Sequence, residues 1–257
     1  MESSRNISVR ELYIGYGKRQ IANDINFDLN EGELCAIVGI NGIGKSTLLR
    51  TLGNLQPGLN GEIKLNNLYL AKLSTIDLSK QLSIVLTESI ASKNLTVSEL
   101  ISLGRQPYTN WLGTLNERDT ELIERSINLF ELNDLKNRKC YELSDGQLQR
   151  VLIARAMAQD TPIILLDEPT THLDLYHKVQ IFKLLKQLVK QHQKTILFTS
   201  HEIDLAIQLC DKILLLDGKE NPFGAPCELI ERGCFETLFP NETVFFDHKT
   251  GTFKVNK

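Results

Sequence analysis

A glycine-rich segment near the N-terminus has the residues of a phosphate-binding loop. It fits the pattern GxxxxGK[ST] and reads Gly39-Ile40-Asn41-Gly42-Ile43-Gly44-Lys45-Ser46-Thr47. An apolar run at 34–38 precedes it and a helical pattern follows, so backbone N–H groups and the positive helix end could face an anion. The pattern predicts that Lys45 reaches the β- and γ-phosphates of a nucleotide and that the Ser46 hydroxyl binds Mg²⁺.

Two acids end a later apolar run, where they could act on the same phosphates. Asp167 and Glu168 follow the run 163–166 and precede a proline. Adjacent strand residues point to opposite sides, so Asp167 could hold Mg²⁺, usually through water, while Glu168 could face the water that attacks the γ-phosphate. Taken alone, the pair could be an ordinary exposed turn. The phosphate loop makes the catalytic interpretation the better one.

A histidine and a capped helix complete the set of candidate groups. His201 follows the next predicted strand and should lie at the same sheet edge. A lone histidine is more often packed or solvated, but this one has a phosphate and a catalytic acid as expected neighbours. The segment Leu143-Ser144-Asp145-Gly146-Gln147 places a serine N-cap and a glycine at a helix start, which predicts either a second anion site or an ordinary capped helix.

The order of these motifs resembles the ATPases of ATP-binding cassette (ABC) transporters. Tyr16 is similar to the aromatic residue that stacks on adenine, Leu143 to Gln147 to the family signature, 171–174 to the D-loop with Asp174, and His201 to the switch histidine. In that family the signature of one subunit closes over the nucleotide of the other. The resemblance therefore implies a homodimer that sandwiches two ATP, with Ser144, Gly146 and Gln147 acting in trans.

Two positions depart from the family pattern. The family places a glutamine beside Mg²⁺ after a strand, whereas Thr87 stands there in this chain. We expect either that Thr87 remains near the metal, that Glu88 substitutes, or that coupling runs differently. Asp145 replaces the first glycine of the signature pair. A carboxylate suits a helix N-terminus, yet it would repel a nearby γ-phosphate, and the sequence does not resolve this conflict.

The elements that position these groups alternate between strands and helices. Strands are predicted at 7–13, 21–29, 34–38, 62–65, 163–166, 195–198 and 213–216. Helices are predicted at 96 onward, 122–129, 144 onward and 176–191, with a short helix between 198 and 213 and a terminal hairpin at 243–255 turning at 249–251. This rhythm predicts an α/β fold with a largely parallel sheet. The resemblance implies a single P-loop NTPase domain of the ABC type over 1–257, with an α/β core (about 1–87 and 161–257), an antiparallel β subdomain, and an inserted helical subdomain (about 88–160).

Composition restricts the functional class. The 257 residues carry a net charge of −3, which gives no electrostatic footprint for nucleic acid. Five scattered cysteines without CxxC spacing predict neither a disulfide framework nor a zinc site. We see no secretory signal and no apolar run of about 20 residues that could span a bilayer. A role in transport would therefore require a separate membrane partner.

One segment points to a transporter class. Residues 104–113 resemble the ATPases of bacterial iron-chelate, haem and cobalamin importers, although they could simply be surface of the helical subdomain. This resemblance implies a transmembrane permease, indirectly a periplasmic or lipoprotein substrate-binding protein, and a peripheral position on the cytoplasmic face of the inner membrane. The alternatives are a soluble ABC ATPase acting on nucleic acid or ribosomes, which typically carries a coiled-coil insertion or two cassettes, and a non-ABC phosphate-loop enzyme, which would leave 143–147 unexplained.

Overall fold

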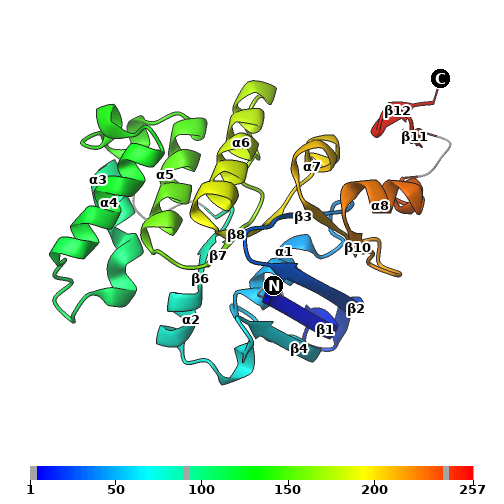
Figure 1. Cartoon of the computed structure of the whole chain (residues 1–257), viewed down its shortest axis with the longest axis horizontal. Coiled ribbons are helices and arrows are strands. Elements are labelled where there is room, and N and C mark those ends of the chain that lie inside the picture. The colour runs from blue at the N-terminus through cyan, green and yellow to red at the C-terminus, as the bar shows by residue number, and fades with distance from the viewer. Residues whose placement is uncertain (1–4, 89–92, 240–242, 257) are drawn as a thin grey trace.

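A six-stranded sheet forms the centre of the molecule (Figure 1). The computed structural model describes residues 5–88, 93–239 and 243–256. The strand order is β10-β9-β3-β8-β7-β6, and all neighbours are parallel except β10, which is antiparallel to β9. The strands are β3 (Leu34–Val38), β6 (Leu82–Val85), β7 (Ile163–Leu166), β8 (Thr195–Thr199), β9 (Lys212–Leu215) and β10 (Phe223–Gly224). The predicted, mainly parallel core sheet is confirmed.

The parallel strands are buried on both faces, which explains why their sequences are apolar without alternation. Along β3, Leu34 and Ala36 belong to a core shared with α6 (Leu175–His192). Cys35, between them, belongs to a second core shared with α1 (Lys45–Leu52). Figure 1 shows α6 on one side of these strands and the antiparallel strands on the other. The sheet is therefore clamped between two apolar layers, and its edges are free to carry polar groups.

A four-stranded antiparallel sheet covers the second core, as the resemblance implied. Its order is β2-β1-β4-β5. The strands are β1 (Arg5–Tyr16), β2 (Arg19–Asn30), β4 (Asn60–Leu65) and β5 (Leu68–Tyr69). Apolar side chains such as Ile7, Val9 and Phe27 point into the core. Both long strands extend beyond the predicted limits, because residues at their ends continue the backbone pairing. Ile14, past the predicted end of β1, also packs into the core.

Among the described residues between β6 and β7, three α-helices form one end of the molecule (Figure 1). They are α3 (Val97–Ser102), α4 (Glu117–Leu129) and α5 (Asp145–Ala158). The predicted capping box of α3 is present: the Thr96 hydroxyl accepts from the Glu99 N–H at 3.2 Å, and the Glu99 carboxylate accepts from the Thr96 N–H at 2.6 Å. This group corresponds to the predicted helical subdomain, whose limits at 88 and 160 stay a prediction.

The segment 104–113, which suggested the transporter class, is partly structural rather than surface. Gly104 is buried, and a β-carbon there would lie 2.3 Å from a backbone oxygen of α5. The guanidinium of Arg105, 4% exposed, donates to Asp119 of α4 at 2.9 Å and to two carbonyl oxygens at the C-terminal end of α5. Trp111, in contrast, is 92% exposed. The first half of the segment therefore fastens two helices together.

Removing the Arg105 guanidinium should destabilise the fold strongly. We expect Arg105→Ala to lower the free energy of unfolding by about 3–5 kcal/mol, because it leaves a buried carboxylate without its cation. The matched control is Glu124→Ala, also on α4, whose pair with Lys136 is exposed at 47% and 40%. That change should cost less than about 1 kcal/mol. Urea denaturation measures both, and equal losses would contradict the buried-pair argument.

The C-terminal part packs against the far end of the sheet. It contains α7 (Ile203–Leu209), α8 (Pro226–Glu231) and a hairpin of β11 (Val244–Asp247) and β12 (Thr252–Val255). The predicted hairpin is confirmed, with its turn between these strands. The ring of Phe246 stacks on Phe235 at a centroid distance of 5.1 Å and meets Phe253 edge-on at 5.0 Å. Aromatic contacts therefore hold the hairpin.

Two short helices were missed by the sequence analysis. The helix α2 (Thr75–Gln81) and α8 are too short to show a helical period. Local signals were nevertheless present, since the Ser74 hydroxyl accepts from the Asp77 N–H at 3.1 Å and Pro226 stands at the first position of α8. Across the described ranges, none of the helices has the length and apolar character needed to cross a bilayer.

Candidate functional site

The predicted phosphate loop joins β3 to α1 and borders a cavity of about 310 Å³. The cavity is lined by Asn41, Gly42, Gly44, Lys45, Ser46, Thr47, Glu168 and His201. Gly44 has a φ of 112°, and a β-carbon there would lie 2.7 Å from the Ile21 side chain. A β-carbon on Gly39 would lie 2.4 Å from the backbone oxygen of Leu216. These two glycines are therefore required for the loop to pass between its neighbours.

Lys45 is folded back over the loop. Lys45 is only 4% exposed, and its Nζ donates to the carbonyl oxygens of Gly39 at 2.9 Å and Ile40 at 3.1 Å. Burial lowers the pKa of Lys45, although the charges of Glu168 and Asp167 raise it in part. Because burial disfavours the ammonium ion, an anion placed in the cavity would gain a strong charge interaction with it.

Asp167 gathers three hydroxyl groups. Ser46 and Thr199 donate to its Oδ1 at 2.9 and 2.7 Å, and Thr87 donates to its Oδ2 at 3.1 Å. Asp167 as a whole is 3% exposed. The structure thus brings together Ser46, Asp167 and Thr87, the three residues predicted at the metal. Thr199 was missed, although its position just before Ser200 and His201, at the end of β8, places it at the same sheet edge.

The choice between Thr87 and Glu88 is decided by where each side chain points. Thr87 faces Asp167, as described above. The Glu88 carboxylate instead accepts from Arg50 at 2.7 Å and is 66% exposed. Of the two residues, Thr87 is therefore the one whose oxygen lies at the candidate metal position.

Glu168 lines the cavity of the phosphate loop, whereas the neighbouring Asp167 does not. Its Oε1 is 2.5 Å from His201 Nε2, and its Oε2 accepts from the Thr171 hydroxyl at 2.9 Å. Its backbone has a φ of 48°, a left-handed conformation that is uncommon for a residue with a side chain. The Glu168 N–H donates to the Thr199 hydroxyl at 2.7 Å, which helps hold this turn.

His201 bridges the acid and the lysine. Its Nδ1 lies 3.4 Å from Lys45 Nζ, which can only donate, and its Nε2 lies beside the Glu168 carboxylate, which accepts. The tautomer with the proton on Nε2 satisfies both contacts. Lys45, His201 and Glu168 therefore form one hydrogen-bonded chain along the cavity wall.

Tyr16 stands at the edge of the loop. It is 54% exposed, and its hydroxyl lies 3.3 Å from the Thr47 hydroxyl in the first turn of α1. Its ring is therefore accessible beside the phosphate loop, where the resemblance expects it to stack on adenine.

The signature residues form a capped helix start elsewhere in the chain. The Ser144 hydroxyl accepts from the Gln147 N–H at 3.3 Å, and the Gln147 side chain accepts from the Ser144 N–H at 3.0 Å. Neither residue, nor Gly146, lines the cavity of the phosphate loop. Asp174 caps α6 by accepting from the His177 N–H at 2.9 Å. Within one protomer the structure does not bring these residues to the phosphate loop.

Asp145 faces a second cavity of about 470 Å³, on the other side of Asp167 and Glu168. Thr87 and Lys93 line the same cavity. Asp145 therefore borders a cleft between the sheet edge and the helices of its own chain, whereas Gly146 faces His177 of α6. The sequence left open whether the Asp145 carboxylate would repel a nearby γ-phosphate. The structure bears on this question because Asp145 and Gly146 face different parts of the protomer.

The oxygen groups around Asp167 fit Mg²⁺. This ion prefers oxygen ligands and is usually held by one or two protein oxygens together with substrate phosphates. The Ser46 hydroxyl and the Asp167 carboxylate are of this kind, and Thr87 offers a third oxygen. In the described part of the chain, no three His, Cys, Asp or Glu side chains cluster in a way that could hold a metal. Because Mg²⁺ commonly takes substrate phosphates as further ligands, a metal here would be shared with a phosphate ligand.

Comparison with known proteins supports the resemblance drawn from the motifs. A family model described as ABC transporter matches residues 22–171. The iron(3+)-hydroxamate import ATP-binding protein FhuC of Bacillus subtilis (strain 168) is 38% identical over 210 residues, which are 82% of this chain and 78% of that protein.

Solved structures give the same result for the fold. An ABC transporter of the metal-chelate type, in an inward-facing conformation, superposes with a TM-score of 0.82 at 28% identity and covers 94% of this chain and 91% of its own. A dimeric post-hydrolysis state of the ATP-binding cassette MJ0796, bound to ADP and phosphate, superposes with a TM-score of 0.73 at 28% identity, covering 86% and 98%. Since the family model spans more than half of the chain, and the phosphate loop meets Glu168 and His201 at one cavity, this chain is an ATPase that belongs to the ABC transporter family.

Proposed function

We propose that the chain is the ATP-hydrolysing subunit of an importer for ferric chelates, working as a homodimer with Mg²⁺ and two ATP. Two similar proteins support this substrate class, one by its iron(3+)-hydroxamate name and one by its metal-chelate type. The sequence left ferric chelates, haem and cobalamin open as substrates. Because of these two similar proteins, we favour ferric chelates. The substrate itself would be selected by a binding protein and a membrane permease.

One observation supports the proposed homodimer. Lys45, Glu168 and His201 meet at one cavity, while Ser144, Gly146 and Gln147 begin a helix that does not line it. A second protomer can supply what the first lacks, because a two-fold dimer places the same surface of each subunit against the other. The dimeric state of the similar cassette MJ0796 supports this arrangement. In the proposed dimer, the Ser144 turn of one protomer seals the nucleotide held by the other.

The hydrogen-bonded chain along the cavity suggests how hydrolysis proceeds. When ATP enters, its phosphates compete with two carbonyl oxygens for the Lys45 ammonium, and its γ-phosphate competes with Glu168 for His201. Glu168 is then free to take a proton from the attacking water, whose oxygen bonds to the γ-phosphorus as the bond to the bridging oxygen of ADP breaks. Mg²⁺ bound with the nucleotide would neutralise charge on the phosphates. Most of the rate would come from positioning and from charge stabilisation.

The permease is proposed to dock on an apolar groove between α2 and the segment that follows α3. This groove has a volume of about 550 Å³ and is lined mainly by uncharged residues. Ile76 is 63% exposed and Leu103 is 47% exposed at its border. The groove lies next to the buried ion pair between Arg105 and Asp119, which holds one of its walls in place. Docking there would hold the subunit at the cytoplasmic face of the membrane.

A mixing experiment tests the shared site. Lys45→Ala and Ser144→Arg proteins should each lack ATPase activity, because each homodimer has two damaged sites. When the two are mixed, half of the dimers are mixed and each has one intact composite site, so about a quarter of wild-type activity should return. The matched control mixes Lys45→Ala with Glu168→Gln, whose defects lie in the same half-site, and this mixture should stay inactive. If the first mixture stays as inactive as the control, the shared site is wrong.

A further inference from the structure

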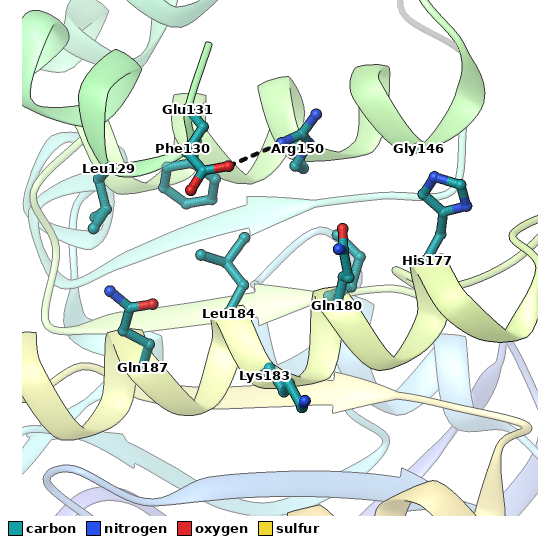
Figure 2. A pocket seen from close by; sticks show the side chains of 11 residues that line it. Leu129, Phe130, Glu131, Gly146, Arg150, His177, Gln180, Lys183, Leu184 and Gln187 are labelled. Carbon is teal, nitrogen blue, oxygen red and sulfur yellow. Dashed lines mark ion pairs between the residues drawn. The ribbon is translucent and has the colours of Figure 1, made fainter.

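A groove of about 270 Å³ separates α5 from α6 (Figure 2). Figure 2 shows Gln180 and Leu184 pointing from α6 toward α5 across this groove, while Lys183 points away. At the end of the groove, the His177 ring rises from α6 toward Gly146 of α5. His177 and Gly146 thus line the end of the groove, between two elements that the proposed dimer would present to its partner.

The His177 side chain is tied to Asp174. Its Nδ1 lies 2.8 Å from Asp174 Oδ1, and its backbone N–H donates to the same oxygen at 2.9 Å. Because a carboxylate accepts hydrogen bonds, Nδ1 must carry the proton. These two hydrogen bonds lower the pKa of Asp174. One histidine thus fixes the orientation of a carboxylate that is 67% exposed.

The opposite edge of the same ring packs against the start of α5. A β-carbon on Gly146 would lie 3.2 Å from Cδ2 and 3.6 Å from Cγ of His177. The glycine therefore leaves the space that the imidazole fills, two residues after the Ser144 N-cap. Ser144, like Asp174, is exposed. A single ring accordingly contacts both the D-loop carboxylate and the helix that carries the signature.

We propose that His177 is a positioning residue that couples Asp174 to the N-terminus of α5, so that the D-loop and the signature turn meet the partner protomer as one unit. This inference rests on the proposed dimer. It requires both contacts of the ring, since the hydrogen bond holds Asp174 and the packing holds Gly146. A ring that merely filled the groove would affect stability and leave dimer formation unchanged.

Two variants separate the contacts. His177→Phe keeps a ring against Gly146 and loses the donor to Asp174, while His177→Asn keeps a donor near the Nδ1 position and loses the ring. In a Glu168→Gln background with saturating MgATP, we expect each to weaken dimerisation about fivefold or more, as measured by analytical ultracentrifugation. ATP affinity of the dilute monomer and the melting temperature should stay close to those of the parent. Adding Asp174→Ala to His177→Phe should cause no further loss, because the coupled unit is already broken.

Gln180→Ala, one turn further along the same groove, is the matched control and should dimerise like the parent. Parent-like dimerisation by either His177 variant would overturn the coupling, because each variant retains only one of its two contacts. An equal loss of ATP affinity by the monomer would also overturn it, since His177 would then act within its own site. If the Glu168→Gln parent itself fails to dimerise, the proposed function fails first, and that result is recognisable before any change at His177.

Discussion

Glu168→Gln should lower kcat for ATP hydrolysis by about 10²–10⁴-fold, the usual contribution of a general base. The amide keeps an oxygen that can accept from His201 Nε2, so the geometry of the cavity should survive, but it cannot take a proton from water. ATP should still bind, and the protein should accumulate as an ATP-bound dimer. Steady-state turnover together with ultracentrifugation in MgATP measures both effects.

The control for this prediction is Glu202→Gln. Glu202 is the residue after His201, yet its carboxylate accepts from Lys178 at 2.6 Å instead of entering the cavity. Its ATPase activity should stay within about twofold of wild type, as expected for a residue that binds neither substrate nor metal. Wild-type turnover by Glu168→Gln would remove Glu168 from the base role, whatever the control shows.

Lys45→Ala should weaken ATP binding by about 10- to 100-fold, which corresponds to the loss of a charged hydrogen-bond donor to the phosphates. Cells that carry only this variant should also lose uptake of a ferric siderophore. The reason is that Lys45, a residue that is 4% exposed, is the one lysine or arginine among the described residues that line the cavity. Fluorescent-nucleotide titration measures the first effect, and radioactive iron uptake measures the second.

Lys249→Ala serves as the matched control, because Lys249 is exposed in the turn of the C-terminal hairpin, far along the chain from the phosphate loop. It should bind ATP and support uptake like the wild type. Unchanged ATP affinity in Lys45→Ala would contradict the phosphate-loop assignment. Lost ATP binding with normal uptake of the ferric chelate would leave the loop assignment intact and overturn the proposed substrate class.

Local sequence patterns predicted many residues of the candidate site, because each motif depends on residues that are close in the chain. The loop 39–47 needs glycines where its backbone has positive φ or touches a neighbour, and a serine cap such as Ser144 bonds only three residues ahead. Strand ends could be placed together because parallel strands end at one sheet edge. The convergence of Asp167, Glu168 and His201 was therefore within reach of the sequence.

Contacts between distant residues lay beyond that reach. Thr199 and Thr87 donate to the same carboxylate across 32 and 80 residues, and Arg105 finds Asp119 and the end of α5 within the helical group. The sequence immediately around a threonine or an arginine is the same kind of sequence whether that residue is buried or exposed, so it does not predict these contacts. Thr87 faces Asp167 while Glu88 pairs with Arg50, which lies 38 residues away, and neither contact can be read from the local pattern.

The amino-acid sequence by itself determined the phosphate loop, the order of the motifs and the α/β rhythm, since these follow from spacing, turn chemistry and apolar periodicity along a short stretch of chain. Only the tertiary structure decided which hydroxyls surround Asp167, that His201 links Lys45 to Glu168, and that His177 joins Asp174 to Gly146. The physical reason is that packing of the sheet edges and helices, rather than local backbone preference, sets the distances between residues far apart in the chain.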